Sequence, residues 1–64
     1  MIVNGKPAEL AAAVSIRDFL QREGYDAERV AVEKNGEIVP RKRFAEEMLS
    51  DGDKVEIVQF VGGG

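Results

Sequence analysis

The chain has 64 residues and a net charge of −3, from 9 Lys and Arg against 12 Asp and Glu. Its length limits it to a small core, so residues 1–64 are expected to fold as a single domain. The absence of cysteine and histidine excludes disulfides and thiol chemistry and removes the commonest metal ligand and general base, so we expect no metal site.

The first residues are typical of a β-hairpin. Residues 1–3 are apolar and β-prone, and Asn4-Gly5 is the dipeptide most favoured in a two-residue type I′ turn. Residues 6–14 are then expected to pair back in the antiparallel direction. Pro7 and the three consecutive alanines at residues 11–13 make this second strand weak, so we expect it at an edge of the sheet.

A short helix is predicted over residues 16–23, because the signals for its start, face and end agree. Ser15 is placed to cap the N-terminus with its hydroxyl. Gly24 supplies a left-handed residue at the other end, and Tyr25 is expected to fold back against Leu20 as in a Schellman motif. The helix has one apolar stripe, formed by Ile16, Phe19 and Leu20.

The second half of the chain is predicted to contain three strands joined by turns. Asn35-Gly36 marks a tight turn between the first two strands, and Pro40 stops the second. The expected strands are residues 30–32, residues 38–39 and the run from Val55 to Val61. Residues 44–49 are expected to form one helical turn with three inward side chains, Phe44, Met48 and Leu49.

The predicted order, β-β-α-β-β-β, belongs to the α+β class. One helix covers only one face of a sheet of four to five strands, so the opposite face is expected to be open. Alternation along the last strand places Val55 and Ile57 under the helix. The predicted core is Val3, Ile16, Phe19, Leu20, Val30, Val32, Val55 and Ile57.

Two apolar residues in the last strand are predicted to face the open side. Val58 and Phe60 alternate with the inward residues and come directly before the glycine tail. Adjacent exposed apolar side chains indicate a docking surface. The alternative is that both residues pack under the loop of residues 41–44.

The C-terminal glycines, Gly62, Gly63 and Gly64, are expected to form a thin, flexible arm that ends in a free carboxylate. Such an arm can enter a narrow site on a partner, whereas the alternative is a frayed terminus or a leftover linker. A carboxylate ionises near pH 3.5 and is a poor electrophile. The chain has no nucleophile–base pair to activate it, so we expect no enzyme activity. A partner enzyme would have to convert the carboxylate into an acyl donor, most simply an acyl-adenylate made from ATP.

Charge and hydropathy argue against nucleic acid and membranes as partners. Arg41-Lys42-Arg43 is the one basic cluster, and a run of this length is more typical of a solvated loop than of a phosphate-binding patch. No stretch approaches the roughly 20 apolar residues of a membrane span. The N-terminus also lacks the pattern of a signal peptide, so we expect a cytoplasmic protein.

Two motifs give the chain a resemblance to a known family. A small roll that ends in Gly-Gly is similar to the β-grasp, ubiquitin-like carriers. Asn-Gly-Glu-Ile-Val-Pro-Arg at residues 35–41 and Asp-Gly-Asp at residues 51–53 resemble the ThiS family, the sulfur carriers of thiamin thiazole biosynthesis. The resemblance covers essentially the whole chain. It implies a β-grasp roll whose mixed sheet carries one main helix on one face, with residues 61–64 as a flexible tail.

The resemblance implies that partner enzymes modify Gly64. A ThiF-like adenylyltransferase adenylates the carboxylate with ATP and magnesium, and sulfur derived from cysteine converts it to a thiocarboxylate. A ThiG-like thiazole synthase then receives the sulfur. The carrier itself binds no cofactor and is expected to be a monomer when free. The residues carried over are Gly63 and Gly64 for the chemistry and Val58, Phe60 and Val61 for docking. Gly62 departs from the family, whose arm need not have a third glycine.

Three other functions remain open. The small subunit of molybdopterin synthase shares the fold and tail chemistry, but it is typically longer and often has prolines before its Gly-Gly. A ubiquitin-like modifier would join Gly64 to lysines of target proteins. A plain interaction domain would leave the tail without a role.

Overall fold

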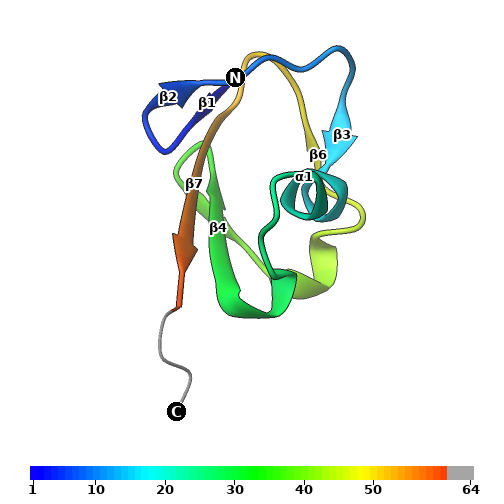
Figure 1. The fold of residues 1–64 in the computed structure, drawn as a ribbon, viewed down its shortest axis with the longest axis vertical. Helices are drawn as coiled ribbons and strands as arrows, with labels where there is room; N and C mark the ends of the chain where they lie inside the picture. The colour runs from blue at the N-terminus through cyan, green and yellow to red at the C-terminus, as the bar shows by residue number, and fades with distance from the viewer. Residues whose placement is uncertain (61–64) are drawn as a thin grey trace.

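The computed structural model of the chain describes residues 1–60, in which one α-helix packs against a five-stranded sheet (Figure 1). The helical elements are α1 (Ile16–Arg22) and two 3₁₀ turns, η1 (Ala27–Arg29) and η2 (Arg41–Arg43). The strands are β1 (Ile2–Val3), β2 (Lys6–Pro7), β3 (Val14–Ser15), β4 (Val30–Lys34), β5 (Glu37–Val39), β6 (Met48–Leu49) and β7 (Lys54–Gln59).

The main sheet has the order β2-β1-β7-β4-β5, which makes the last strand of the chain the central strand. β7 runs parallel to β1 and antiparallel to β4, so the sheet is mixed. This arrangement confirms the predicted α+β roll with one main helix on one face. β3 and β6 form a separate antiparallel pair beside α1.

Both Asn-Gly turns form as predicted. Asn4 and Gly5 have φ values of 51° and 81°, and Asn35 and Gly36 have 53° and 86°. Two consecutive positive φ values are the signature of a type I′ turn, which suits the twist of a hairpin.

The predicted second strand over residues 6–14 is wrong beyond its first two residues. β2 ends at Pro7, and the last bond of this hairpin runs from the Ala8 N–H to the Met1 carbonyl, at 2.8 Å. Residues 8–13 cross to the other side of α1, where Val14 and Ser15 pair with β6 instead. Proline has no N–H with which to extend the ladder, and the alanines that follow bring little apolar surface to hold a strand.

The helix signals are confirmed at both ends. The Ser15 hydroxyl accepts from the Asp18 N–H at 3.1 Å. At the C-terminus, the Tyr25 N–H donates to the Leu20 carbonyl at 2.9 Å and the Gly24 N–H donates to the Gln21 carbonyl at 3.2 Å. These two bonds, with Gly24 at φ 82°, form a complete Schellman motif. α1 itself ends at Arg22, one residue before the predicted end.

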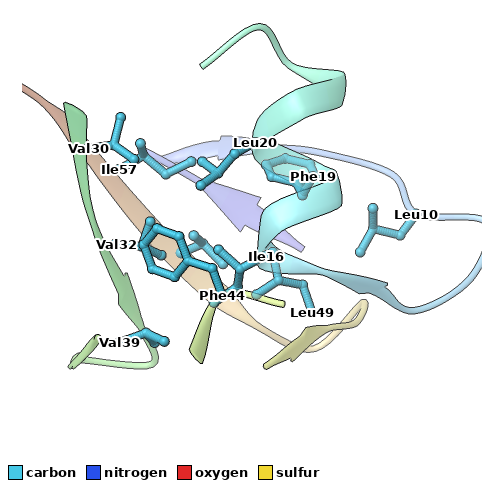
Figure 2. Packing of buried hydrophobic residues seen from close by; sticks show 11 residues of the cluster. Leu10, Ile16, Phe19, Leu20, Val30, Val32, Val39, Phe44, Leu49 and Ile57 are labelled. Atoms are coloured by element: carbon cyan, nitrogen blue, oxygen red, sulfur yellow. The ribbon is translucent and has the colours of Figure 1, made fainter. Parts of the chain in front are cut away.

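A single apolar core lies between α1 and the sheet (Figure 2). The predicted core residues are buried, except that Val3 is only partly buried. Leu10 and Val39 were not predicted. Leu10 lies on the side of α1 away from β4, so the loop before β3 covers the flank of the helix that the sheet does not reach (Figure 2). The buried apolar side chains are Leu10, Ile16, Phe19, Leu20, Val30, Val32, Val39, Phe44, Leu49, Val55 and Ile57.

The predicted helical turn over residues 44–49 is wrong in position. η2 precedes it, a bond from the Glu47 N–H to the Arg43 carbonyl at 2.8 Å closes a helical turn over residues 43–47, and residues 48–49 form β6. Phe44 and Leu49 are buried as predicted, but Met48 is 47% exposed. Adjacent residues of a strand point to opposite faces, so burying Leu49 turns Met48 outward. The same segment supplies hydrogen-bond acceptors to the first turn of α1. The Ile16 N–H donates to the Glu47 carbonyl and the Arg17 N–H donates to the Phe44 carbonyl, both at 2.9 Å.

No helix within residues 1–60 has the length and apolar character needed to cross a bilayer.

Candidate functional site

The site begins with β7, whose two faces differ sharply in burial. Val55 and Ile57 are 1% and 7% exposed, whereas Val58 and Phe60 are 56% and 54% exposed. The predicted alternation is therefore confirmed. Because more than half of each side chain is exposed, neither Val58 nor Phe60 packs under the loop of residues 41–44.

The strand register identifies the residues that share a face with Val58. We call this side of the main sheet, turned away from α1, the open face. Directly paired residues in neighbouring strands point the same way, and the pairs Val58–Ala31, Glu56–Glu33, Glu33–Ile38 and Lys54–Ile2 place all seven residues on the open face. Phe60 continues the alternation of Glu56 and Val58 one step beyond β7.

Most of the large apolar side chains that are exposed within residues 1–60 lie on the open face. They are Ile2, Ile38, Val58 and Phe60, and the remaining one, Met48, lies on β6. Exposed apolar residues that gather on one face mark an interaction surface more often than scattered ones do. Ile2 and Ile38 were not predicted as site residues. Alternation was the available signal, but their place on this face depends on which strands pair.

The position of Phe60 is fixed by bonds that continue past the end of β7. Its N–H donates to the Arg29 carbonyl at 2.8 Å, which extends the ladder between β7 and the segment before β4. Arg41 holds that segment in turn, because its guanidinium donates to the Ala27 carbonyl at 2.9 Å and the Glu28 carbonyl at 3.2 Å. The backbone at Phe60 is thus connected through η1 to η2.

Two of the three cations in the basic run are engaged within the chain. Arg41 also lies 3.5 Å from the Glu28 carboxylate, and Arg43 bonds the Glu47 carboxylate at 2.8 Å. Lys42 is the one member of this run that has no ion pair among the described residues. The run therefore serves mainly to join η2 to its neighbours.

Within residues 1–60, the two carboxylates with shifted pKa values are in turns and loops rather than on the open face. A hydrogen bond from Lys34, together with its charge, lowers the pKa of Glu47. Hydrogen bonds from the Asn35 side chain and the Ser50 backbone lower the pKa of Asp53. Both carboxylates are held in the charged form by structural bonds, which do not suit an acid or base catalyst. Residues 1–60 contain no group of three or more acidic, His or Cys side chains that could hold a metal ion.

The remaining predicted site residues are Val61, Gly62, Gly63 and Gly64, and they lie outside the described residues. The described part contributes Val58 and Phe60, which directly precede them in the chain.

Comparison with known proteins gives consistent matches. The family model described as the ThiS family matches residues 1–64. The sulfur carrier protein ThiS of Bacillus subtilis is 44% identical over 50 residues, which are 78% of this chain and 76% of that protein. The crystal structure of the thiamine biosynthesis protein (ThiS) from Geobacter metallireducens matches with a TM-score of 0.83 and 38% identity, covering 98% of this chain and 96% of that one. This likeness confirms the predicted β-grasp fold.

Two other relatives are much longer proteins than this chain, which matches only one part of each. The thiazole synthase of Paramagnetospirillum magneticum is 42% identical over 64 residues, which are all of this chain but only 20% of that protein. The thiazole synthase of Magnetococcus marinus shows the same relationship, with 36% identity over 97% of this chain and 19% of the synthase. The chain thus spans about a fifth of these relatives.

Proposed function

Since the chain belongs to the ThiS family, we propose that it is a sulfur carrier of thiamin biosynthesis and that the carboxylate of Gly64 is its carrier group. The protein is not itself the catalyst. Its described residues offer a docking surface and no nucleophile–base pair. The chemistry belongs to partner enzymes, as it does for any substrate held on a carrier.

The reaction sequence takes three steps. An adenylyltransferase of the ThiF kind joins the Gly64 carboxylate to the α-phosphate of ATP and releases pyrophosphate, with magnesium bound to the nucleotide. Sulfur derived from cysteine then attacks the carbonyl carbon as sulfide and displaces AMP, which leaves a thiocarboxylate. If the sulfur arrives as a persulfide, the product is an acyl disulfide, and a thiol must reduce it to release the thiocarboxylate. A ThiG-like thiazole synthase takes the sulfur into the thiazole ring, and hydrolysis restores the carboxylate.

The observation that carries this proposal is the position of Val58 and Phe60. They expose apolar side chains on the central strand of the sheet, directly before the four residues that end in Gly64. A partner that binds this surface has the terminal carboxylate within reach, because three extended residues span about 10 Å. Val61, Gly62 and Gly63 connect the surface to the reacting group.

The thiazole synthase relatives support the choice of the receiving partner. In two of them a segment similar to this chain is part of the same polypeptide as the synthase. Joining a carrier to the enzyme that consumes its cargo raises the effective concentration of one for the other. We infer that this carrier meets a synthase of the same kind, that it acts in the cytoplasm and that it is a monomer when free.

Intact-mass measurement after incubation with ATP, a ThiF-like enzyme and a sulfur source tests the proposal. We expect the gain that corresponds to the replacement of one oxygen by sulfur, and no gain in a chain that lacks Gly64. An unchanged mass, with an activating enzyme that works on its own carrier, would contradict it.

Two experiments separate the alternatives. If molybdopterin synthase accepts the thiocarboxylate and thiazole synthase does not, the pathway assignment is wrong. If cells accumulate proteins with Gly64 joined to lysines, the chain is a modifier rather than a carrier.

A further inference from the structure

Two glutamates are direct cross-strand partners at the centre of the open face. Glu33 on β4 and Glu56 on β7 are direct partners in the antiparallel register. In such a pair the Cβ atoms lie about 4.5–5.5 Å apart, and like charges in this position destabilise the sheet. Neither side chain takes part in an ion pair or a hydrogen bond within the described residues. The fold therefore maintains a local repulsion that it does not neutralise.

The acidic pair is bordered by the apolar residues of the open face. Ile38 is the direct partner of Glu33 on the other side, and Val58 follows Glu56 by one step on the same face. Both apolar side chains are more than half exposed. Lys54 lies on this face too, but not within 4.0 Å of either carboxylate. The surface thus combines two unneutralised negative charges with an apolar border.

We propose that the pair Glu33 and Glu56 receives a cationic side chain of the activating adenylyltransferase, an arginine or a lysine set among apolar residues that cover Ile38, Val58 and Phe60. This inference rests on the proposed carrier function and specifies how the partner recognises the carrier. A guanidinium is the better fit, since it is planar and offers five N–H donors, enough for both carboxylates. Binding turns a repulsion in the free carrier into an attraction in the complex.

Charge complementarity selects this occupant over the others. A second copy of the chain docked by the same face would bring four carboxylates together, which is unfavourable in an interface that excludes water. A nucleic acid would bring phosphates to the same acidic surface. A protein with a cation inside an apolar patch matches both features, and such a charge at the centre of an interface is typical of a binding hot spot.

Charge-neutral variants of the same shape test the proposal. Glu33→Gln and Glu56→Gln each remove one negative charge, and Glu23→Gln is the matched control. Glu23 is exposed, caps the C-terminus of α1 on the other side of the sheet and has no ion pair among residues 1–60. All three variants change the net charge equally, so they share any general effect on long-range steering.

The measurement is the affinity of the full-length carrier for the adenylyltransferase at low and at physiological salt, together with the melting temperature of the free carrier. We expect each open-face variant to weaken binding by about tenfold and to reduce its salt dependence, whereas Glu23→Gln changes affinity less than about twofold. The melting temperature of the open-face variants should equal or exceed that of the wild type, because the cross-strand repulsion is relieved. A loss of affinity no larger than that of the control would overturn the inference.

Two further outcomes distinguish a failure of the cation site from a failure of the proposed carrier function. If the wild-type chain gains sulfur while both open-face variants bind as it does, the carrier function stands and the cation site is wrong. If sedimentation shows that the wild type dimerises and that the variants dimerise more tightly, the face is covered by a second copy and the proposal is again wrong.

Discussion

The side chain of Asn4 bonds both backbone polar groups of Ile57: its Oδ1 accepts from the Ile57 N–H at 2.7 Å and its Nδ2 donates to the Ile57 carbonyl at 3.3 Å. The amide thus continues the ladder that β1 would otherwise end at Val3. On the other side of β7, the Oδ1 of Asn35 accepts from the Lys54 N–H at 2.9 Å. Each Asn-Gly turn therefore connects its hairpin to the central strand, which also carries Val58, one of the two residues proposed for docking.

Replacing Asn4 should destabilise the fold without touching the core. Asn4→Gly keeps a residue that accepts a φ of 51° but leaves the Ile57 polar groups without these partners. We expect a loss of about 1–2 kcal/mol in the free energy of unfolding, measured by urea denaturation. Asn4→Ala should cost about 1 kcal/mol more, since it adds the strain of a left-handed backbone. Equal stabilities for Asn4→Gly and the wild type would show that the two bonds contribute nothing.

The ion pairs of Glu47 predict how stability depends on pH. Lys34 bonds this carboxylate at 2.9 Å, and its hydrogen bond and charge lower the pKa of Glu47 below the ordinary value. A group with a lower pKa in the folded than in the unfolded state stabilises the fold above the unfolded pKa, about 4.3 for glutamate. That contribution is lost as the pH falls through the folded pKa. Stability should therefore decline below about pH 4.

Glu47→Gln should lower the urea midpoint at neutral pH and make its decline in acid shallower than in the wild type. Glu46→Gln is the matched control, because Glu46 is exposed and has no ion pair among residues 1–60. We expect the control to follow the wild-type curve. An acid decline that is the same in Glu47→Gln would assign the effect to other carboxylates, with Asp53 the next to test because its pKa is also lowered.

Local signals in the sequence predicted the parts of the fold that local bonds create. The caps of α1 and both Asn-Gly turns are decided by residues a few positions apart, and each was predicted correctly. β3 and β6 were missed because each has only two residues and is stabilised by the other, across more than thirty positions. No periodicity is visible in a strand of that length. Leu10 was missed for a related reason, since its burial depends on where an irregular loop crosses α1.

The candidate site was predicted along one strand but not across the sheet. Alternation alone assigned Val58 and Phe60 to the open face, and their exposure confirms it. Glu33 and Ile38 join them only through the register between β4 and its neighbours. A shift of one residue in that register would turn every one of these side chains to the other face, so a single sequence does not determine which of them meet.

Phe60 and Phe44 should respond oppositely to truncation. Phe60 is 54% exposed, so Phe60→Ala should cost less than about 1 kcal/mol of unfolding free energy while it weakens binding to the adenylyltransferase. Phe44 is 4% exposed within the core, and Phe44→Ala should cost about 3–5 kcal/mol. Urea denaturation and an affinity measurement on both variants check this. A loss of stability in Phe60→Ala as large as that in Phe44→Ala would make Phe60 a core residue rather than a docking residue.

Deleting Gly63 and Gly64 should separate chemistry from folding. The core is built from side chains between Leu10 and Ile57, and glycine adds no side chain to it, so the melting temperature should stay within about 2 °C of the wild type. Adenylation should be abolished, because the carboxylate would be moved two residues closer to the sheet and out of reach of the partner's active site. Binding through Val58 and Phe60 should persist in part, which makes the truncated chain a competitive inhibitor of the full one. A truncated chain that is still adenylated at the normal rate would show that adenylation does not depend on the length of the C-terminal tail.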